Sequence, residues 1–409
     1  MLYRSTSRNS KNVTLYEAVR HSVNTDGGIY LPERIPVIPR AFFNNISEMT
    51  LPDIGYVVAN MLFGEDIDSE TLQAIVKNAI NFDIPMRKLE DRIHTLELFH
   101  GPTGSYKDFG ARFMAHLHQR FIRPGQKSNI LIATRGDAGE AVAKAFFGMD
   151  NVRVFVLYPH KPDASAKRRT GFAKLGANIV PVEIRGCFAD CLELVKRASS
   201  DEELGREIDL QTANSLNVAR LLPQTFYYFY AFARLSRIMD ARKIRLVVSI
   251  PIGNLGNLTS GLIAKRMGLP IDRFIVARTS TSPYFLSEYF ITGRDPEDIP
   301  PGSVSPNFER LKMLYDDNHN ELSKIVEIVH YPSVPEIDPA FEGVFDSSGK
   351  AAYSALKERI REGETGIVIG TSSPAEEKFK QQNHSGARHT QLPQSYPIFK
   401  EYLLTNALR

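Results

Sequence analysis

The chain has 409 residues, with 50 lysines and arginines against 47 aspartates and glutamates, so its formal net charge is only +3. A chain of this length exceeds what one hydrophobic core normally serves, so we expect two or three subdomains with a ligand cleft between them. The small positive surplus, without a long basic run, argues against nucleic acid and favours a small molecule as the partner.

The first residues, 1–8, lack the apolar core of a signal peptide, and no stretch approaches the roughly 20 apolar residues that cross a bilayer. We therefore expect a cytoplasmic enzyme without a membrane partner. The two cysteines, Cys187 and Cys191, are spaced like neighbours on one helical face and do not match a zinc-binding or disulfide pattern. We expect two reduced thiols and no metal ligands.

The hydrophobic pattern predicts an α/β protein with a helical cap over residues 1–95. From about residue 128, short β-rich runs alternate with helical patterns, which is typical of βαβ units on a parallel sheet. We predict strands at residues 129–134, 152–158, 178–183, 246–251, 273–277 and 366–370. We predict helices at residues 50–62, 69–80, 139–148, 164–175 and 188–199. The polar stretches 280–307 and 380–396 indicate loops.

The segment His100-Gly-Pro-Thr-Gly-Ser-Tyr-Lys107-Asp-Phe-Gly110 contains the best candidate for covalent chemistry. Lys107 lies among small, polar and aromatic residues just before a helical pattern. A lysine amine can bind an aldehyde cofactor as an imine and later shuttle protons, provided that desolvation or neighbouring cations suppress its charge. We predict that Lys107 is the catalytic residue.

A glycine-rich turn, Gly253-Asn-Leu-Gly-Asn257, follows the strand predicted at 246–251 and opens onto an apolar helix. Such a turn points successive amides inward, and the helix start adds a partial positive charge, so a phosphate can bind there. The spacing matches neither a P-loop nor Gly-x-Gly-x-x-Gly. Taken alone, the turn fits phosphate binding and a tight strand-to-helix connection equally well.

A second loop of this kind, Thr134-Arg-Gly-Asp137-Ala-Gly139, follows the strand predicted at 129–134. Its amides could bind a substrate carboxylate or a cofactor ring oxygen. The alternative interpretation is an ordinary strand-to-helix turn with Asp137 as the N-cap. Clustered hydroxyls also follow the strand at 366–370, in Thr371-Ser372-Ser373.

Together with the opening run 26–33 and the run 213–224, these motifs resemble the threonine synthases, which are pyridoxal-phosphate enzymes of fold type II, similar to tryptophan synthase β. The agreement runs in order from about residue 3 to 375. The resemblance implies open, mostly parallel sheets with flanking helices. It divides the chain into the cap at 1–95, a small cofactor subdomain at 96–215 and a large one at 216–409.

The resemblance also implies pyridoxal 5′-phosphate as the cofactor and assigns roles to residues. Lys107 would form the imine, the loop would bind the cofactor phosphate, Thr371 would meet the pyridine nitrogen, and Asp137 would lie near the ring. The reaction would convert O-phosphohomoserine to threonine and phosphate, with Lys107 as base and acid. The expected phosphate-binding residues are Gly253, Asn254, Leu255, Gly256 and Asn257. The expected substrate-binding residues are Arg135, Gly136, Asp137, Asn214, Ser215 and Arg220.

The chain departs from the family pattern where the substrate should bind. Arg135 and Ala138 replace a serine and a threonine, and residues 165–168 gain positive charge. Thr279-Ser-Thr-Ser282 replaces an asparagine and an aspartate, the loop at 295–306 is shortened, and Ser348 and Ser373 replace histidines. Two alternatives therefore remain open: elimination or replacement on another O-phospho amino acid, such as phosphothreonine or phosphoserine, and a catalytically silent paralogue. We expect a monomer or a homodimer.

Overall fold

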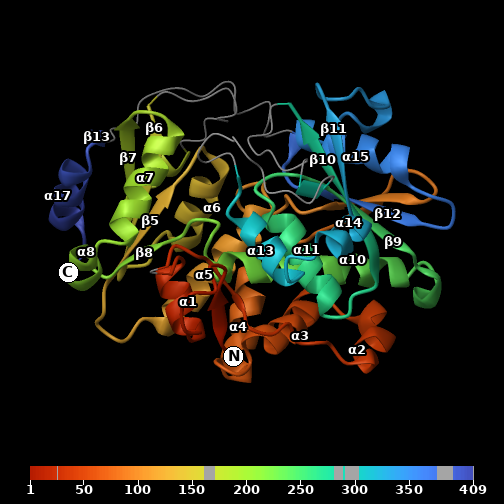
Figure 1. Cartoon of the computed structure of the whole chain (residues 1–409), viewed down its shortest axis with the longest axis horizontal. Helices are drawn as coiled ribbons and strands as arrows, with labels where there is room; N and C mark the ends of the chain where they lie inside the picture. Colours follow the sequence, from red (N-terminus) through yellow and green to blue (C-terminus); the bar gives the residue numbers. More distant parts are fainter. Residues whose placement is uncertain (25, 161–170, 281–288, 291–303, 375–389, 409) are drawn as a thin grey trace. The chain divides into compact units, whose positions relative to one another are not determined.

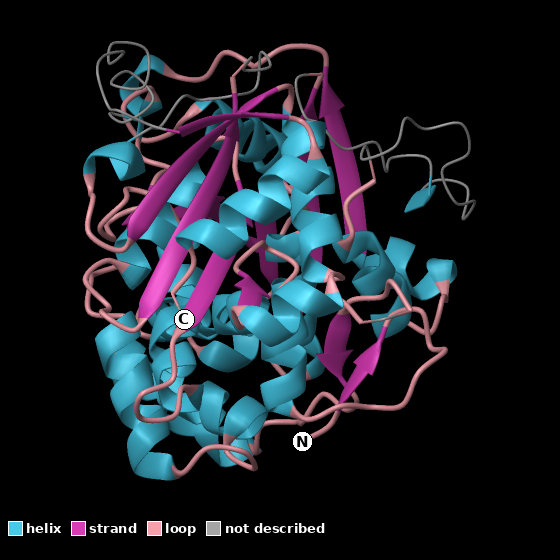
Figure 2. Cartoon of the chain, turned by 90° about the vertical axis from the view of Figure 1, so that its left-hand side faces the viewer, coloured by secondary structure: helices cyan, strands magenta, loops and turns pink. Residues whose placement is uncertain are grey.

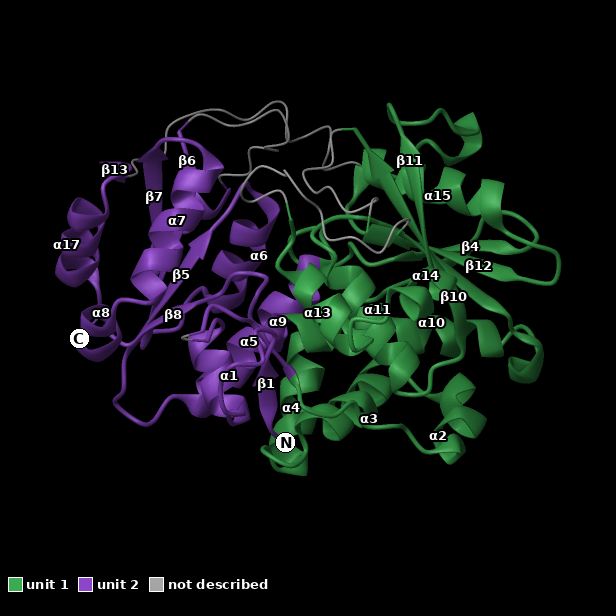
Figure 3. Cartoon of the chain, in the orientation of Figure 1, with its two compact units in different colours: residues 1, 32–106, 221–377 green, residues 2–31, 107–220, 378–409 purple. Residues whose placement is uncertain are grey.

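The computed structural model describes residues 1–24, 26–160, 171–280, 289–290, 304–374 and 390–408. The chain forms two compact units (Figure 3). Unit 1 comprises residue 1 with residues 32–106 and 221–377, and unit 2 comprises residues 2–31, 107–220 and 378–409. This division differs from the three consecutive subdomains that we expected, because the first 95 residues are shared between the units and the last segment returns to unit 2. No described helix combines the length and the apolar character that a membrane span requires.

Unit 1 is built on a six-stranded sheet in the order β11-β10-β9-β12-β4-β3, in which only the pairing of β3 with β4 is antiparallel. Its strands are β3 Met86–Lys88, β4 Ile93–Glu97, β9 Leu246–Pro251, β10 Ile271–Thr279, β11 Val326–Tyr331 and β12 Thr365–Gly370. Its helices are α2 Arg40–Asn45, α3 Leu51–Phe63, α4 Ser69–Ala79, α10 Phe226–Ser236, α11 Gly256–Arg266, α13 Asn307–Leu314, α14 His319–Ile325 and α15 Ser347–Arg359. Every residue of β4, β9 and β12 is buried, as expected of parallel strands covered on both faces.

Unit 2 contains a five-stranded parallel sheet in the order β13-β7-β6-β5-β8. Its strands are β5 Ser128–Ala133, β6 Val152–Pro159, β7 Ile179–Arg185, β8 Leu210–Thr212 and β13 Thr390–Pro393, and β1 Tyr3–Ser5 and β2 Tyr30–Pro32 form a separate pair. Its helices are α1 Leu15–His21, α5 Lys107–Phe121, α6 Asp137–Phe146, α7 Phe188–Ser199, α8 Glu202–Glu207, α9 Val218–Leu221 and α17 Tyr396–Asn406.

The core of unit 2 lies between this sheet and helices α7 and α17. Figure 2 looks onto the strands of the sheet, with helices in front of them. Leu131 and Phe155 on the strands pack with Leu194 of α7 and with Phe399 and Leu403 of α17. The predicted α/β class with mostly parallel sheets is thus confirmed.

The loop predicted at 380–396 is wrong over its last residues, because Thr390–Pro393 forms β13 and pairs in parallel with β7. The pattern hides this strand because it lies at the sheet edge and buries only Leu392. The helix predicted at 164–175 lies partly outside the described residues, and Gly171–Lys174 forms a short 3₁₀ helix instead. Most of the loop predicted at 280–307 also lies outside them.

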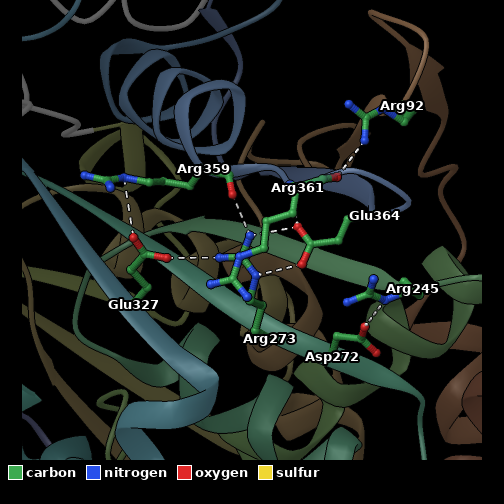
Figure 4. Close-up of polar contacts among 8 residues, drawn as sticks. All are labelled: Arg92, Arg245, Asp272, Arg273, Glu327, Arg359, Arg361 and Glu364. Carbon is green, nitrogen blue, oxygen red and sulfur yellow. Dashed lines mark hydrogen bonds and ion pairs between the residues drawn. The ribbon is translucent and has the colours of Figure 1, made fainter.

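A buried ion-pair network ties the amino-terminal ends of three strands in unit 1 (Figure 4). Arg273 of β10 donates from Nε and Nη2 to the two carboxylate oxygens of Glu364, at 3.0 and 2.8 Å. Its Nη1 donates to Glu327 of β11 at 3.0 Å, and Nη2 also donates to the carbonyl oxygen of Arg359 at 2.6 Å. Burial raises the pKa of Glu364, but the bonds from Arg273 and from the Arg361 amide outweigh it and lower the pKa overall.

Candidate functional site

Two of the predicted cofactor segments lie at one edge of the sheet in unit 1. Strands β9 and β12 are parallel neighbours, so their carboxyl ends meet at the same edge. The Gly253–Asn257 loop follows β9, and Thr371 follows β12. In open α/β sheets, ligands bind outside the carboxyl ends of the strands. The ion-pair network of Arg273 occupies the opposite, amino-terminal edge.

The Gly253–Asn257 loop has the backbone of an anion-binding turn. Gly253 and Leu255 both adopt positive φ values, of 47° and 61°, and helix α11 begins at Gly256. The amides of the first helical turn have no acceptor within the helix, and the helix dipole places partial positive charge there. The Gly256 amide donates to the Asn254 side chain at 3.2 Å, and the amides of Asn257 and Leu258 follow it in the first turn of the helix, where an anion would bind.

The side chain of Asn257 carries a buried donor at the loop, its Nδ2. Its Oδ1 accepts hydrogen bonds from the hydroxyls of Tyr227, at 2.9 Å, and Tyr228. Its Nδ2 is buried and has no hydrogen-bond partner among the described residues. Because an unsatisfied buried donor is costly, this nitrogen indicates a ligand acceptor at the loop.

A second group of buried side chains holds the loop at the carbonyl oxygen of Asn254. This oxygen accepts hydrogen bonds from Ser305 Oγ and from Asn307 Nδ2, the latter at 3.0 Å. Arg310 in turn donates to Asn307 Oδ1 at 2.8 Å. Arg310 is fully buried, and this burial lowers its pKa to about 9. The loop is therefore anchored through buried side chains of helix α13.

Thr371 lies where β12 meets the segment that precedes Lys107. Its carbonyl oxygen accepts a hydrogen bond from the amide of Tyr106 at 3.0 Å. Ser105 and Ser372 form an antiparallel bridge, and the Ser373 amide donates to Gly104 at 3.1 Å. These bonds fix the backbone immediately before Lys107.

In unit 2, Lys107 and Asp137 face each other. Lys107 is the first residue of α5, and Asp137 is the first residue of α6. Lys107 Nζ lies 3.6 Å from Asp137 Oδ2, with 29% of the lysine side chain and 13% of the aspartate side chain exposed. The amine is thus partly accessible and lies next to one carboxylate.

The interpretation of Asp137 as an N-cap is wrong. Gly136 occupies the N-cap position, and its residue type supplies no side-chain acceptor. Thr134 supplies the side-chain acceptor instead. Its buried Oγ1 accepts hydrogen bonds from the amides of Gly136 and Gly139, both at 2.9 Å. The carboxylate of Asp137 is therefore not used as a cap.

The remaining predicted substrate residues belong to the same edge of the unit 2 sheet. Strands β5 and β8 are parallel neighbours, and the side chain of Asn214, after β8, accepts a hydrogen bond from the Ala133 amide at 3.1 Å. Ser215, the next residue in the sequence, is half-buried. Arg220 is buried and donates to the Ala213 carbonyl oxygen at 2.7 Å, so it supports this loop from within.

Arg135 is half-buried, and its guanidinium carbon lies 4.3 Å from the centre of the Phe188 ring. This cation–π geometry orients the guanidinium against the first residue of α7. The structure thus gathers Lys107, Asp137, Arg135, Gly136, Asn214 and Ser215 in unit 2, and the Gly253–Asn257 loop and Thr371 in unit 1.

Comparison with known proteins identifies the family. The sequence model described as "Pyridoxal-phosphate dependent enzyme" matches residues 86–329, and that described as "Threonine synthase N terminus" matches residues 2–80. Threonine synthase of Haemophilus influenzae is 38% identical over 386 residues, which cover 91% of this chain and 88% of that protein. The chain belongs to the threonine synthase family.

Solved structures agree. The crystal structure of threonine synthase from Escherichia coli matches with a TM-score of 0.84 and 29% identity, and covers 99% of this chain and 100% of that chain. The pyridoxal-phosphate-bound threonine synthase from Brucella melitensis shares the fold, with a TM-score of 0.82, 24% identity and 100% coverage of both chains. This member of the threonine synthase family is therefore a fold type II enzyme that uses pyridoxal phosphate, as predicted.

The local geometry fits this cofactor. The positive-φ turn and the orphaned Asn257 Nδ2 suit a phosphate, and the partly exposed Lys107 amine suits an aldehyde. Sequence reasoning missed the side chains that support the loop: Tyr227, Tyr228, Ser305, Asn307 and Arg310. The three-residue spacing of Asn307 and Arg310 on one helix could have indicated that they contact each other.

Proposed function

We propose that the protein catalyses the threonine synthase reaction, as a carbon–oxygen lyase acting on phosphates. It converts O-phosphohomoserine and water to threonine and phosphate. The observation that carries this proposal is the 38% identity to a threonine synthase over 91% of the chain, together with a lysine and an anion-binding turn at the predicted positions. The comparisons give no support to another O-phospho amino acid or to a silent paralogue.

In this proposal, five residues bind the cofactor phosphate, Lys107 is the attachment point for the aldehyde, and Thr371 is the partner of the ring nitrogen. The phosphate-binding residues are Gly253, Asn254, Leu255, Gly256 and Asn257. The bound cofactor supplies an electron sink for carbanions next to the amino group. A hydroxyl such as that of Thr371 can meet the ring nitrogen without giving up its proton.

Lys107 would move the protons. A single amine can take a proton from one carbon and return it to another, if it is positioned close to both. Asp137, with Oδ2 3.6 Å from Lys107 Nζ, lies at the right place to orient the ammonium form of the lysine. We assign Asp137 this role in addition to its predicted place near the ring.

The substrate would bind at the carboxyl edge of β5 and β8. The turn around Gly136 would bind the carboxylate through amides other than those of Gly136 and Gly139, which donate to Thr134. Arg135 suits the phosphate of the substrate, and Asn214 and Ser215 offer polar contacts. Arg220 was predicted to contact substrate as well. Because Arg220 is buried and bonded to Ala213, we propose that it acts by holding this loop.

The test uses Lys107→Ala with Lys144→Ala as the matched control. Lys144 lies in α6 of the same unit and pairs with Glu140 at 3.4 Å. Borohydride treatment followed by peptide mass spectrometry should find a pyridoxyl group on Lys107 of the native and control proteins. An adduct on another lysine would refute the assignment.

The activity arm mixes each protein with O-phosphohomoserine, phosphothreonine or phosphoserine and measures phosphate and threonine. We expect both products from O-phosphohomoserine with the native and control proteins. We expect none above background with Lys107→Ala. Phosphate release from another substrate without threonine would replace our proposal with the elimination alternative.

We also propose a cytoplasmic location and a monomer or homodimer. Cys187 is exposed and Cys191 is buried, and both are free thiols, as a reducing compartment would keep them. Burial raises the pKa of the Cys191 thiol to about 12 and so makes it unreactive. Light scattering of the purified protein measures the assembly.

A further inference from the structure

Two adjacent tyrosines converge on the side chain of Asn257. Tyr227 and Tyr228 lie in the first turn of α10, and both are fully buried. The Tyr227 hydroxyl lies 2.9 Å from Asn257 Oδ1. The Tyr228 hydroxyl lies within hydrogen-bond distance of the same oxygen and 2.9 Å from the backbone oxygen of Asn257. Both phenols therefore meet one amide from the same side.

Burial determines the direction of these bonds. It raises the pKa of both Tyr227 and Tyr228 well above the usual value, so each phenol keeps its proton. A neutral phenol can donate one hydrogen bond, and a carboxamide oxygen has two lone pairs to accept them. In the structure Asn257 Oδ1 accepts from both hydroxyls, and rotating the Asn257 amide group by 180° would break both of these hydrogen bonds.

The fixed rotation has a consequence for the nitrogen. With Oδ1 held by the tyrosines, Nδ2 must point away from them, and it is the buried nitrogen that has no partner in the described part of the chain. Asn257 is the second residue of α11, directly after the positive-φ turn. The free donor therefore belongs to the same turn as the amides that suit a phosphate.

The helix packing is built to allow this contact. A Cβ on Gly261 of α11 would lie 2.9 Å from the Tyr228 ring and 2.6 Å from the Phe274 ring, so only glycine allows so close an approach. The rings of Tyr227 and Tyr228 also contact each other, with centroids 4.9 Å apart and planes tilted by 38°. The Tyr228 ring is thus packed closely against α11 and against the Tyr227 ring.

We propose that Tyr227 and Tyr228 are positioning residues that orient the Asn257 carboxamide, so that its NH₂ donates to the cofactor phosphate. This inference rests on the proposed role of the Gly253–Asn257 loop. The two tyrosines do not touch the phosphate. They stabilise the orientation of the Asn257 carboxamide in which Nδ2 faces the phosphate. In the opposite orientation, Oδ1 would face the anion.

The experiment compares Tyr227→Phe, Tyr228→Phe and the double variant with two references. Tyr230→Phe, a half-buried tyrosine of the same helix, is the matched control. Asn257→Asp keeps the oxygen that accepts from the tyrosines and replaces the NH₂ by a second acceptor, so it tests whether the phosphate is near. For each apoprotein we measure the thermal midpoint and the dissociation constant for pyridoxal phosphate. For each loaded protein we record the ³¹P resonance of the cofactor.

We expect each single tyrosine variant to bind the cofactor about 3- to 10-fold more weakly, since one hydrogen bond contributes on the order of 1 kcal/mol. The double variant should lose more, and the ³¹P resonance should move in all three. Tyr230→Phe should match the native protein. Because the apoprotein midpoints are measured, a change in binding without a matching fall in the midpoint separates positioning from loss of packing.

Two failures are distinguishable. If Asn257→Asp binds pyridoxal phosphate as the native protein does, the Asn257 side chain does not face the phosphate, and the proposed function loses its assignment of the loop as the phosphate site. If Asn257→Asp fails to bind but the double tyrosine variant shows native affinity and an unmoved ³¹P resonance, the site stands and the positioning role is refuted.

Discussion

At the scale of single residues, Arg135 offers the sharpest test of how the substrate is recognised. Arg135 belongs to the loop that we assign to the substrate carboxylate, and its guanidinium stacks on Phe188. Arg135→Ser should raise the KM for O-phosphohomoserine about 10- to 100-fold, because a charge-assisted hydrogen bond contributes on the order of 1.5–3 kcal/mol. Steady-state kinetics with phosphate detection measures this, and kcat should change much less.

Two controls separate recognition from packing in this test. Phe188→Leu removes the stacking partner and keeps the charge, so it should affect KM less than Arg135→Ser does. Arg242→Ser removes a guanidinium whose side chain is 89% exposed and should have no effect. An Arg135→Ser enzyme with native KM would exclude this arginine from substrate binding.

At the scale of elements, the two edges of the unit 1 sheet have different tasks. The carboxyl edge presents the loop and Thr371, and the amino edge is tied by Arg273 and Glu364, whose side chains are 7% and 1% exposed. Arg273→Met leaves the Glu364 carboxylate buried without its bidentate partner. We expect a loss of about 3–5 kcal/mol in the free energy of unfolding, measured by urea titration.

The control for this prediction is the double variant, which combines Arg273→Met with Glu364→Leu. Removing both charges should restore part of the stability, because the remaining cost of a buried unpaired carboxylate disappears. Folded Arg273→Met should still bind pyridoxal phosphate with native affinity, since the loop lies at the other edge. A double variant less stable than Arg273→Met would contradict this explanation.

Sequence patterns predict those elements best whose residues are uniformly buried or strongly periodic. Strand β9 and helix α7 have the bounds that the pattern predicts, because all six residues of β9 are buried and α7 has one continuous apolar face. Strand β13 was not predicted, because an edge strand with one buried residue has almost no hydrophobic pattern in the sequence.

The site was predictable only in part, for a similar reason. Lys107 and the glycine turn have local signatures. The contact of Tyr228 with Asn257 joins residues 29 apart, and that of Asn307 with Asn254 joins residues 53 apart. No local pattern reports such pairs. The alternative interpretation of Asp137 as an N-cap failed because Thr134, three residues earlier, supplies the acceptor instead.

At the scale of the whole molecule, acid should destabilise the protein through His118. This histidine is buried, its Nε2 has no hydrogen-bond partner in the described ranges, and burial lowers its pKa from 6.5 to about 4. Between these values only the unfolded chain binds the proton at this side chain. Its contribution to stability is therefore complete above pH 6.5 and is lost as the pH falls to 4, by up to about 3 kcal/mol.

The measurement is the urea midpoint of the native protein and of His118→Phe between pH 7.5 and 4.5. The phenylalanine keeps the edge-to-face contact with Phe146, whose ring lies 5.6 Å from that of His118, and cannot be protonated. The urea midpoint of His118→Phe should fall less steeply than that of the native protein as the pH is lowered. As a control, His330→Gln changes an exposed histidine, and the slope of its urea midpoint against pH should equal that of the native protein. Equal slopes for all three proteins would show that His118 does not couple folding to pH.

The division into two units also belongs to this scale, and its consequence concerns biosynthesis. The chain passes between the units after residues 1, 31, 106, 220 and 377, so neither unit is a continuous stretch of sequence. On the ribosome, unit 2 receives β13 and α17 last, although Phe399 and Leu403 fill the same core as Leu131. A nascent chain that lacks α17, Tyr396–Asn406, would expose an open apolar surface, and chaperones should remain bound until translation of α17 closes it.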